Sequence, residues 1–369
     1  MKNILDRVEI IFIKTLSFVA ICVFWTSISL ANNEWVEFYN NARSLGMGGA
    51  SVAVTSDETS LFRNPANLGS IRDTYGTLLD PEVDASSNFV RQVTAKSTSK
   101  AFDIPEVISV LDSNRDTYYH ARMQVSPSIV TRYFGVGLIY KNEMDSEMNT
   151  AGTLMDLKYY NDVGVVMGSN VRFFDGRVKL GGSAKMINRI EVVNPTLSTG
   201  GPTDLGTIAS EGTAFAFDGG LLLQAPWMYI PTLGVVVHDI GGTKFDKDDG
   251  LRLKANSRPA TVSQSVDAAL SLFPIHGNEL RSVWTLEYSD ILNSRNDTDQ
   301  AKRIHVGMEL NARDIFFFRL GYNQRYWTAG FEISGSYFQW QVSSYGEEIG
   351  TAQAPREDRR LASKISLRF

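Results

Sequence analysis

The feature that most constrains the fold of this chain is an alternation of apolar and polar side chains with a period of two. It recurs from about residue 118 to the end. In residues 301–311 the even positions from Ile304 to Leu310 are apolar, whereas the odd positions include Arg303 and Glu309. Because successive side chains of a strand point to opposite faces, this pattern predicts strands with one apolar and one polar face. We expect strands at 72–80, 118–129, 132–141, 154–171, 177–191, 212–225, 229–240, 258–273, 279–291, 301–311, 315–322, 326–334, 336–346 and 358–369.

The number and length of these strands favour a membrane barrel. They number about 14, an even count as in single-chain bacterial barrels, and most suit the roughly 9–11 residues of a tilted membrane strand. After residue 31 no apolar run approaches the roughly 18 residues that a spanning helix needs. We therefore predict an all-β fold, a transmembrane antiparallel β-barrel of about 14 strands over residues 71–369. A long polar connection at 81–117 would hold a short helix near 105–111.

The first 31 residues resemble a secretory signal peptide. Basic residues are followed by a nearly continuous apolar run at 15–31, and Ser29 and Ala31 are small where a signal peptidase requires it. A membrane anchor and a lipid-modified Cys22 are the alternatives, but no basic flank follows the run. Removal of residues 1–31 would leave no cysteine, which excludes disulfides and thiol chemistry.

The C-terminal strand carries a second targeting feature. Ile365, Leu367 and Phe369 alternate with Lys364 and Ser366, so the apolar side chains are expected to face lipid and the polar ones the lumen. A last strand that ends on an aromatic residue resembles the signal that barrel-assembly machinery recognises. The expected partners are therefore outer-membrane lipids and that machinery.

Residues 32–70 are too rich in glycine and small side chains to form lipid-facing wall. Because they precede the first strand, they can fold back into the lumen as a plug, or hatch. A phosphate-binding loop is disfavoured, since no strand precedes the glycines and no helix follows them as such a loop requires. The candidate hatch positions are Arg43, Gly46, Gly48, Gly49, Asp57, Asn64, Pro65 and Ala66.

The run from Ala42 to Val54, followed by Asn64-Pro65-Ala66, resembles the N-terminal segment of FadL-like outer-membrane proteins. That superfamily includes transporters of fatty acids and hydrocarbons, and PorV-like relatives tied to protein secretion. The resemblance implies a 14-stranded barrel blocked by an N-terminal hatch. Residues 346–350 and 356–360 are also similar to the last loop and strand of PorV-like chains. The lipid-contact residues of the family have no recognisable counterparts here.

The resemblance implies a channel or transporter in the outer membrane of a Gram-negative bacterium, with a small hydrophobic molecule such as a fatty acid as its ligand. The alternative is a PorV-like barrel that serves as a secretion or attachment partner. An apolar lumen cavity would favour the first function, and a large exposed aromatic patch on the external loops the second.

Catalysis, a cofactor, a metal and a nucleic-acid partner are not expected. The four histidines show no metal-binding spacing. His305 and Glu309 share a lumen face, but an ion-pair network with Arg303 and Arg319 explains such groups without chemistry. The net charge of -5, with both signs well mixed, provides no basic patch for nucleic acid.

Overall fold

The computed structural model describes residues 34–369 except 55–56, 97–100, 247–250 and 254. The predicted signal peptide, residues 1–31, lies outside the described residues.

None of the helices in the described part of the chain is long and apolar enough to cross a membrane.

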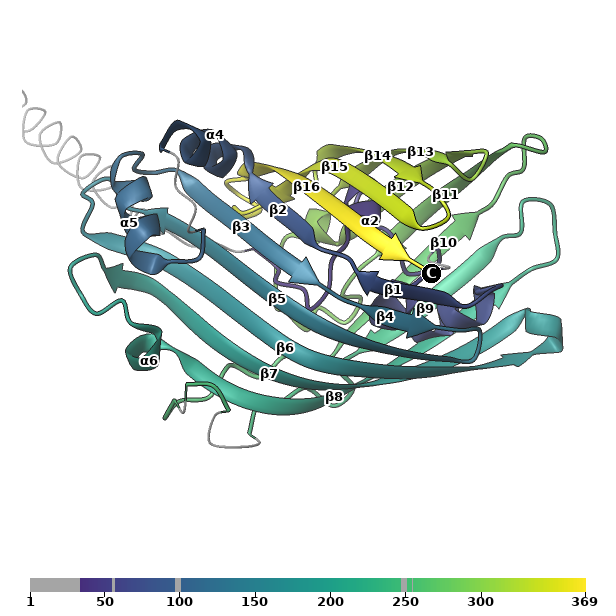
Figure 1. Cartoon of the computed structure of the whole chain (residues 1–369), viewed down its shortest axis with the longest axis horizontal. Coiled ribbons are helices and arrows are strands. Elements are labelled where there is room, and N and C mark those ends of the chain that lie inside the picture. The colour runs from purple at the N-terminus through teal and green to yellow at the C-terminus, as the bar shows by residue number, and fades with distance from the viewer. Residues whose placement is uncertain (1–33, 55–56, 97–100, 247–250, 254) are drawn as a thin grey trace, which may run out of the picture. The chain divides into compact units, whose positions relative to one another are not determined.

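The described chain forms one antiparallel sheet that closes on itself (Figure 1). Its strands are β1 (Tyr75–Leu79), β2 (Glu82–Ser86), β3 (Tyr118–Val125), β4 (Ser128–Val130), β5 (Phe134–Met148), β6 (Leu154–Phe173), β7 (Val178–Ser198), β8 (Ser210–Gln224), β9 (Thr232–His238), β10 (Ser265–Leu272), β11 (Leu280–Tyr288), β12 (Ile304–Ala312), β13 (Phe316–Asn323), β14 (Tyr326–Ser334), β15 (Phe338–Glu348) and β16 (Glu357–Arg368). Strands β1 and β2 both pair with β16, and β3 and β4 both pair with β5. The 16 strands therefore occupy 14 positions in the wall, which confirms the predicted barrel.

Two prolines interrupt the wall without ending it. Pro81 separates β1 from β2, and Pro127 separates β3 from β4, because proline has no N–H for the sheet. The carboxylate of Asp80 accepts hydrogen bonds from the N–H and the hydroxyl of Ser126, at 2.6 and 2.8 Å, and so joins the two breaks. The expected start of the connection at residue 81 is therefore wrong, since the wall continues through β2 to Ser86.

The connection after β2 contains two helices, α4 (Ser87–Lys96) and α5 (Ile104–Asp112). The second agrees with the short helix expected from the sequence, with Pro105 in its first turn. It packs against the outer face of the wall, where Met144 and Met148 of β5 are buried with Val107 and Leu111. Shorter helical turns are α6 (Leu205–Ile208), η2 (Phe174–Gly176) and η3 (Gln300–Arg303).

Strands β5 to β8, with 15, 20, 21 and 15 residues, are longer than the roughly 9–11 residues that a tilted membrane strand needs. The strand β7 has 21 residues, about 70 Å of chain, whereas the hydrocarbon core is roughly 30 Å thick. Outward-facing positions on β5 to β8 carry a ring of polar residues at Asn142, Asn161, Asn188 and Thr213, and beyond this ring many outward residues are apolar but are buried in a cluster with α5. The loop side of these strands therefore forms a projection, which is visible beside α5 and α6 in Figure 1.

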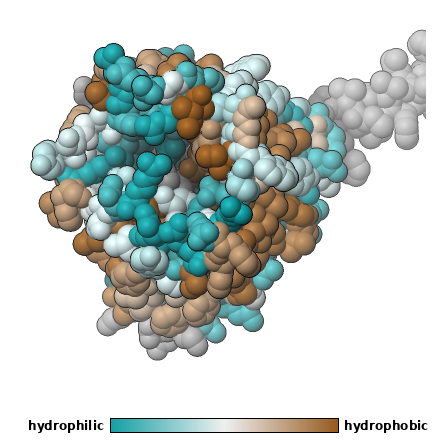
Figure 2. Space-filling model, turned by 90° about the vertical axis from the view of Figure 1, so that its right-hand side faces the viewer, coloured by the Kyte–Doolittle hydropathy of each residue, from teal (hydrophilic) through white to brown (hydrophobic). Residues whose placement is uncertain are grey.

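The opposite end of the barrel carries short turns. In the β6–β7 turn, Asp175 and Gly176 have φ values of 57° and 83°, which agrees with the hairpin expected there. The view toward this end shows hydrophilic residues around a central hollow (Figure 2). On β16, Ile365 and Leu367 are exposed on the outside, whereas Lys364 is buried in the lumen, as the alternation predicts.

Candidate functional site

The lumen contains the N-terminal segment, residues 34–71, of which 55–56 are not described. It includes α2 (Ala42–Gly46), α3 (Ser60–Arg63) and η1 (Pro65–Ser70). Helix α2 contacts β13 to β16, α3 contacts β5 and β6, and η1 contacts β6, β7 and β8. The segment thus reaches widely separated parts of the wall from inside.

The glycines after α2 let the segment approach the wall at backbone distance. A Cβ on Gly48 would lie 2.4 Å from the carbonyl oxygen of Val306 and 2.7 Å from that of Tyr322, and the φ of Gly48 is +70°. Only glycine fits both this conformation and this approach. The wall has matching glycines, since a Cβ on Gly321 would lie 2.4 Å from the nitrogen of Gly48.

The Asn-Pro-Ala turn contacts the opposite wall. The side chain of Asn64 accepts from the N–H of Ala66 at 3.0 Å and donates to the carbonyl of Val52 at 2.9 Å. Pro65 starts η1, where its missing N–H costs no hydrogen bond. A Cβ on Gly181 would lie 2.2 Å from the carbonyl carbon of Pro65, so this turn also requires a glycine in the wall.

Charged groups fix the segment laterally. Arg43 donates to both oxygens of Glu309, at 3.0 and 2.8 Å, and to Asp57 at 2.6 Å. Arg319 bonds the same Glu309 at 2.7 Å from the neighbouring strand. Glu287 accepts from two consecutive backbone N–H groups of the segment, at 2.7 and 2.9 Å, as expected of a lumen-facing carboxylate.

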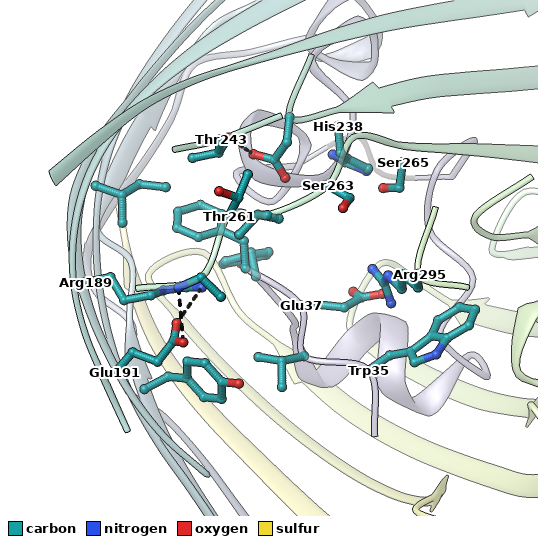
Figure 3. Close-up of a pocket in the computed structure, with 18 of the residues that line it drawn as sticks. Trp35, Glu37, Arg189, Glu191, His238, Thr243, Thr261, Ser263, Ser265 and Arg295 are labelled. Carbon is teal, nitrogen blue, oxygen red and sulfur yellow. Dashed lines mark hydrogen bonds and ion pairs between the residues drawn. The ribbon is translucent and has the colours of Figure 1, made fainter. Parts of the chain in front are cut away.

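A cavity of about 480 Å³ lies on the loop side of the segment (Figure 3). Its floor comprises residues 34–39 with Phe62 and Arg63, and one side is the inner face of β6 and β7. The β9–β10 and β11–β12 connections complete it. Because Tyr160, Arg189 and Glu191 lie beyond the ring of polar outward residues, the cavity is partly within the projection.

The lining of the cavity is amphipathic. A site for a pure hydrocarbon would be expected to have a wholly apolar lining. The apolar lining residues of this cavity include Phe38, Phe62, Ile187, Phe245 and Val262. Charged groups lie against these residues, since Lys185 and Arg189 are each 5.1 Å from the ring centroids of Phe38 and Phe245, respectively, and they occur mostly in pairs. Arg189 bonds Asp162 at 2.7 Å, and Lys185 bonds Asp218 at 2.8 Å.

Two cavity residues near the start of the segment carry further charge. Arg295 lies over the ring of Trp35, 4.5 Å from its centroid, and faces Glu37 in Figure 3. Burial by itself raises the pKa of the Glu37 carboxyl, but the neighbouring Arg63 guanidinium and Arg295 lower that pKa to about 2. Glu37 therefore stays ionised at neutral pH and offsets part of the positive charge.

The structure brings the candidate hatch residues of the sequence to the inner wall, but it also adds residues that the sequence did not indicate. Trp35, Glu37 and Arg295 were not expected in a site. The only signal for the first two was the presence of aromatic and charged side chains in a segment with no strand pattern. Arg295 lies in a connection of ordinary polar composition, so only the fold reveals it.

Two of the four histidines, His305 and His276, make local contacts without a carboxylate, whereas His120 and His238 lie beside carboxylates, with His238 3.6 Å from Asp267 and 3.8 Å from Asp218 at the cavity. His305 lies 2.9 Å from both the carbonyl oxygen of Gly48 and the side chain of Asn323. His276 contacts Ser282 at 2.8 Å in the β10–β11 turn.

No protein-family model and no curated protein matches this sequence. Solved structures do match. The crystal structure of a FadL homologue from Pseudomonas aeruginosa is 11% identical, covers 91% of this chain and 98% of its own, and superposes with a TM-score of 0.51. The chain has the fold of a FadL-like channel. The CymD monoaromatic hydrocarbon channel gives the same result, with 10% identity, coverage of 88% and 96%, and a TM-score of 0.53.

Proposed function

We propose that this FadL-like barrel is a channel in the outer membrane of a Gram-negative bacterium and that it passes small molecules with a hydrophobic part. The observation that carries the proposal is the cavity of about 480 Å³ that ends on the N-terminal segment inside the lumen. Its volume falls in the roughly 300–1,000 Å³ range of small-molecule sites. In this proposal the N-terminal segment is the hatch that a ligand must displace to pass.

The lining of the cavity supports an amphipathic ligand. Phe38, Phe62 and Phe245 offer apolar surface, while Arg295 offers a cation. A molecule with a hydrocarbon part and a carboxylate, such as a fatty acid, matches both surfaces. The structural neighbour CymD is named as a channel for monoaromatic hydrocarbons, which supports transport of apolar molecules by this fold.

The outer-membrane location is supported by the wall itself. Outward residues are apolar between the turns and the ring of polar residues, as a lipid-facing band requires. Ile365, Leu367 and Phe369 present the terminal signal that we propose for the barrel-assembly machinery. Phe369 pairs with Gly76 through two backbone hydrogen bonds, at 2.9 and 3.1 Å, so it also closes the barrel.

The secretion-partner alternative has less support. It would require a large aromatic patch on the external loops. Among the described residues, the most exposed aromatic side chains of connections instead lie in turns at the other end of the barrel: Tyr133, Phe174, Trp227 and Tyr337. Aromatic residues at that position are those of a membrane interface.

Binding to the purified barrel tests the proposed function. We expect palmitate to bind the mature protein in detergent, toluene to bind more weakly and glucose not to bind, as measured by calorimetry. Arg295→Gln should weaken palmitate binding and leave toluene binding unchanged, whereas Arg281→Gln, at the exposed start of β11, should change neither. If neither palmitate nor toluene binds the wild type, the proposed function is wrong.

A further inference from the structure

A buried polar cluster lies beside the cavity, where the start of the N-terminal segment meets β3 and β5. It comprises Glu34, His120, Glu143 and Asp145, each of which offers a ligand atom within 4.8 Å of the others. His120 and Asp145 are directly opposite each other on β3 and β5, and both face the lumen. The proposed channel function uses none of the three wall residues.

The geometry of His120 leaves buried polar atoms without hydrogen bonds. Its Nδ1 lies 2.5 Å from one carboxylate oxygen of Asp145, and the other oxygen of Asp145 has no hydrogen-bond partner. The Nε2 of His120 also lacks a partner and lies 3.7 Å from Asp84. His120 and Asp145 are each only 1% exposed, so bulk water does not satisfy these atoms. Leaving buried polar groups unsatisfied is costly.

Carboxylates outnumber cations around the cluster, even with Lys141, which lies 2.9 Å from Glu143. Arg360 pairs with both Glu34 and Asp358, at 2.7 Å each, so one guanidinium serves two carboxylates. Arg122 is likewise shared between Glu82 and Asp84, at 2.8 and 3.1 Å. Buried carboxylates need compensating positive charge, so this region favours a further cation.

The cluster has room for a small ion and its water. A separate cavity of about 40 Å³ is lined in part by Glu34, His120 and Glu143. That volume exceeds the roughly 10–15 Å³ that one water requires. A bound ion could therefore complete its coordination with water on the cavity side.

We propose that Glu34, His120, Glu143 and Asp145 form a binding site for a divalent transition-metal ion. One imidazole nitrogen with three carboxylates suits Mn²⁺ or Zn²⁺. The direct contact between the Nδ1 of His120 and Asp145 opens to admit the ion, which both then bind, and Asp84 orients the ring through Nε2, as a carboxylate behind a ligating histidine does. Glu34 already accepts hydrogen bonds from Arg360 and Tyr118, so the ion would share this carboxylate with them.

The ion would join the N-terminal segment to the wall, because Glu34 comes from the segment and the other ligands come from β3 and β5. It would therefore hold the start of the segment in place independently of Arg43. This role does not depend on the ligand of the channel, so the metal site and the channel function can fail separately.

Metal titration of the mature, chelator-treated protein tests the site. We expect the wild type to bind one equivalent of Mn²⁺, seen as loss of the free-ion paramagnetic resonance signal, and one equivalent of Zn²⁺ by calorimetry. His120→Gln and Asp145→Asn should weaken binding at least 10-fold. His276→Gln is the matched control, since His276 lies in a turn at the other end of the barrel, and it should bind as the wild type does.

A second measurement separates a metal ligand from a residue needed only for folding. Loading with Mn²⁺ or Zn²⁺ should raise the melting temperature of the wild type and of His276→Gln, but not that of His120→Gln. The proposal is overturned if the wild type binds neither ion, or if His120→Gln binds with unchanged affinity. The wild-type titration decides the question even if the variants fail to assemble.

Discussion

Arg43 in the N-terminal segment and Glu309 on β12 are joined by two hydrogen bonds, at 3.0 and 2.8 Å, across 266 positions of sequence. Both side chains are largely buried inside the barrel. A two-point contact between a guanidinium and a carboxylate fixes orientation as well as distance. This pair is therefore a direct lateral attachment of the segment to the wall.

Loss of this attachment should release the segment. In Arg43→Ala, Asp57 loses its guanidinium partner and Glu309 keeps only Arg319. We expect a loss of about 2 kcal/mol for the docked segment, since hydrogen bonds to charged groups contribute roughly 1.5–3 kcal/mol. That corresponds to roughly a 30-fold larger released fraction. Protease cleavage within residues 34–71 of the folded barrel measures it.

The control for this variant is an ion pair at the surface. Arg313 bonds Glu279 at 2.8 Å in exposed turns. Arg313→Ala should therefore leave protease cleavage of the segment unchanged, and it should lower the free energy of unfolding by no more than about 1 kcal/mol. Equal cleavage of Arg43→Ala and the wild type would contradict the role given to Arg43.

The close approach of Gly48 predicts a strong effect of a single added carbon. Gly48→Ala would place a Cβ 2.4 Å from the oxygen of Val306 at a φ of +70°, so the segment must move away from the wall. We expect faster hydrogen exchange in residues 42–54 by mass spectrometry. Gly277→Ala is the control, because no atom lies within 4 Å of its added Cβ. Unchanged exchange in Gly48→Ala would show that the segment tolerates displacement here.

Removal of residues 32–70 should open the barrel. The wall pairs with itself all around, so it should still assemble without the segment. Planar-bilayer recordings should then show a large stable conductance in the deletion variant and a small one in the wild type. A wild type that conducts like an open porin, or a deletion variant that stays closed, would mean that the segment is not a hatch.

The last residue should control assembly. Deletion of Phe369 removes the aromatic ring over Gly76 and two backbone hydrogen bonds between the first and last strands. We expect little heat-modifiable barrel in the membrane fraction. Phe338→Ala, which removes an exposed aromatic from β15 and leaves the terminus intact, should assemble normally. A normal barrel yield after deletion of Phe369 would exclude the terminal signal.

The stabilisation that the contact between Glu37 and Arg63 provides should be lost at acid pH. Because the pKa of Glu37 in the folded protein, about 2, lies below its ordinary value of 4.5, the contact stabilises the fold above pH 4.5. This contribution is lost as the pH falls from about 4.5 toward 2. The melting temperature of the wild type should therefore fall more steeply in this range than that of Glu37→Gln. Parallel curves would show that Glu37 does not contribute.

The sequence by itself predicted the barrel wall because the wall obeys a local rule. Lipid on one side and the lumen on the other impose a period of two on each strand, and that period is visible without knowledge of neighbours. This alternation predicted that Leu367 faces lipid and that Lys364 faces the lumen. It also predicted the 14 strand positions around the barrel. The prediction failed at Pro81. A proline there indicates the end of a strand, but the wall continues in β2 directly after it.

Only the tertiary structure decided what the lumen contains. Arg43 and Glu309, His120 and Glu34, and Trp35 and Arg295 meet because the wall closes around the N-terminal segment. No periodicity relates such distant positions, since the segment has no regular spacing and its partners come from different strands. The alternation of the strands determined which side chains face inward, but which of them meet depends on closure of the barrel and the path of the segment within it.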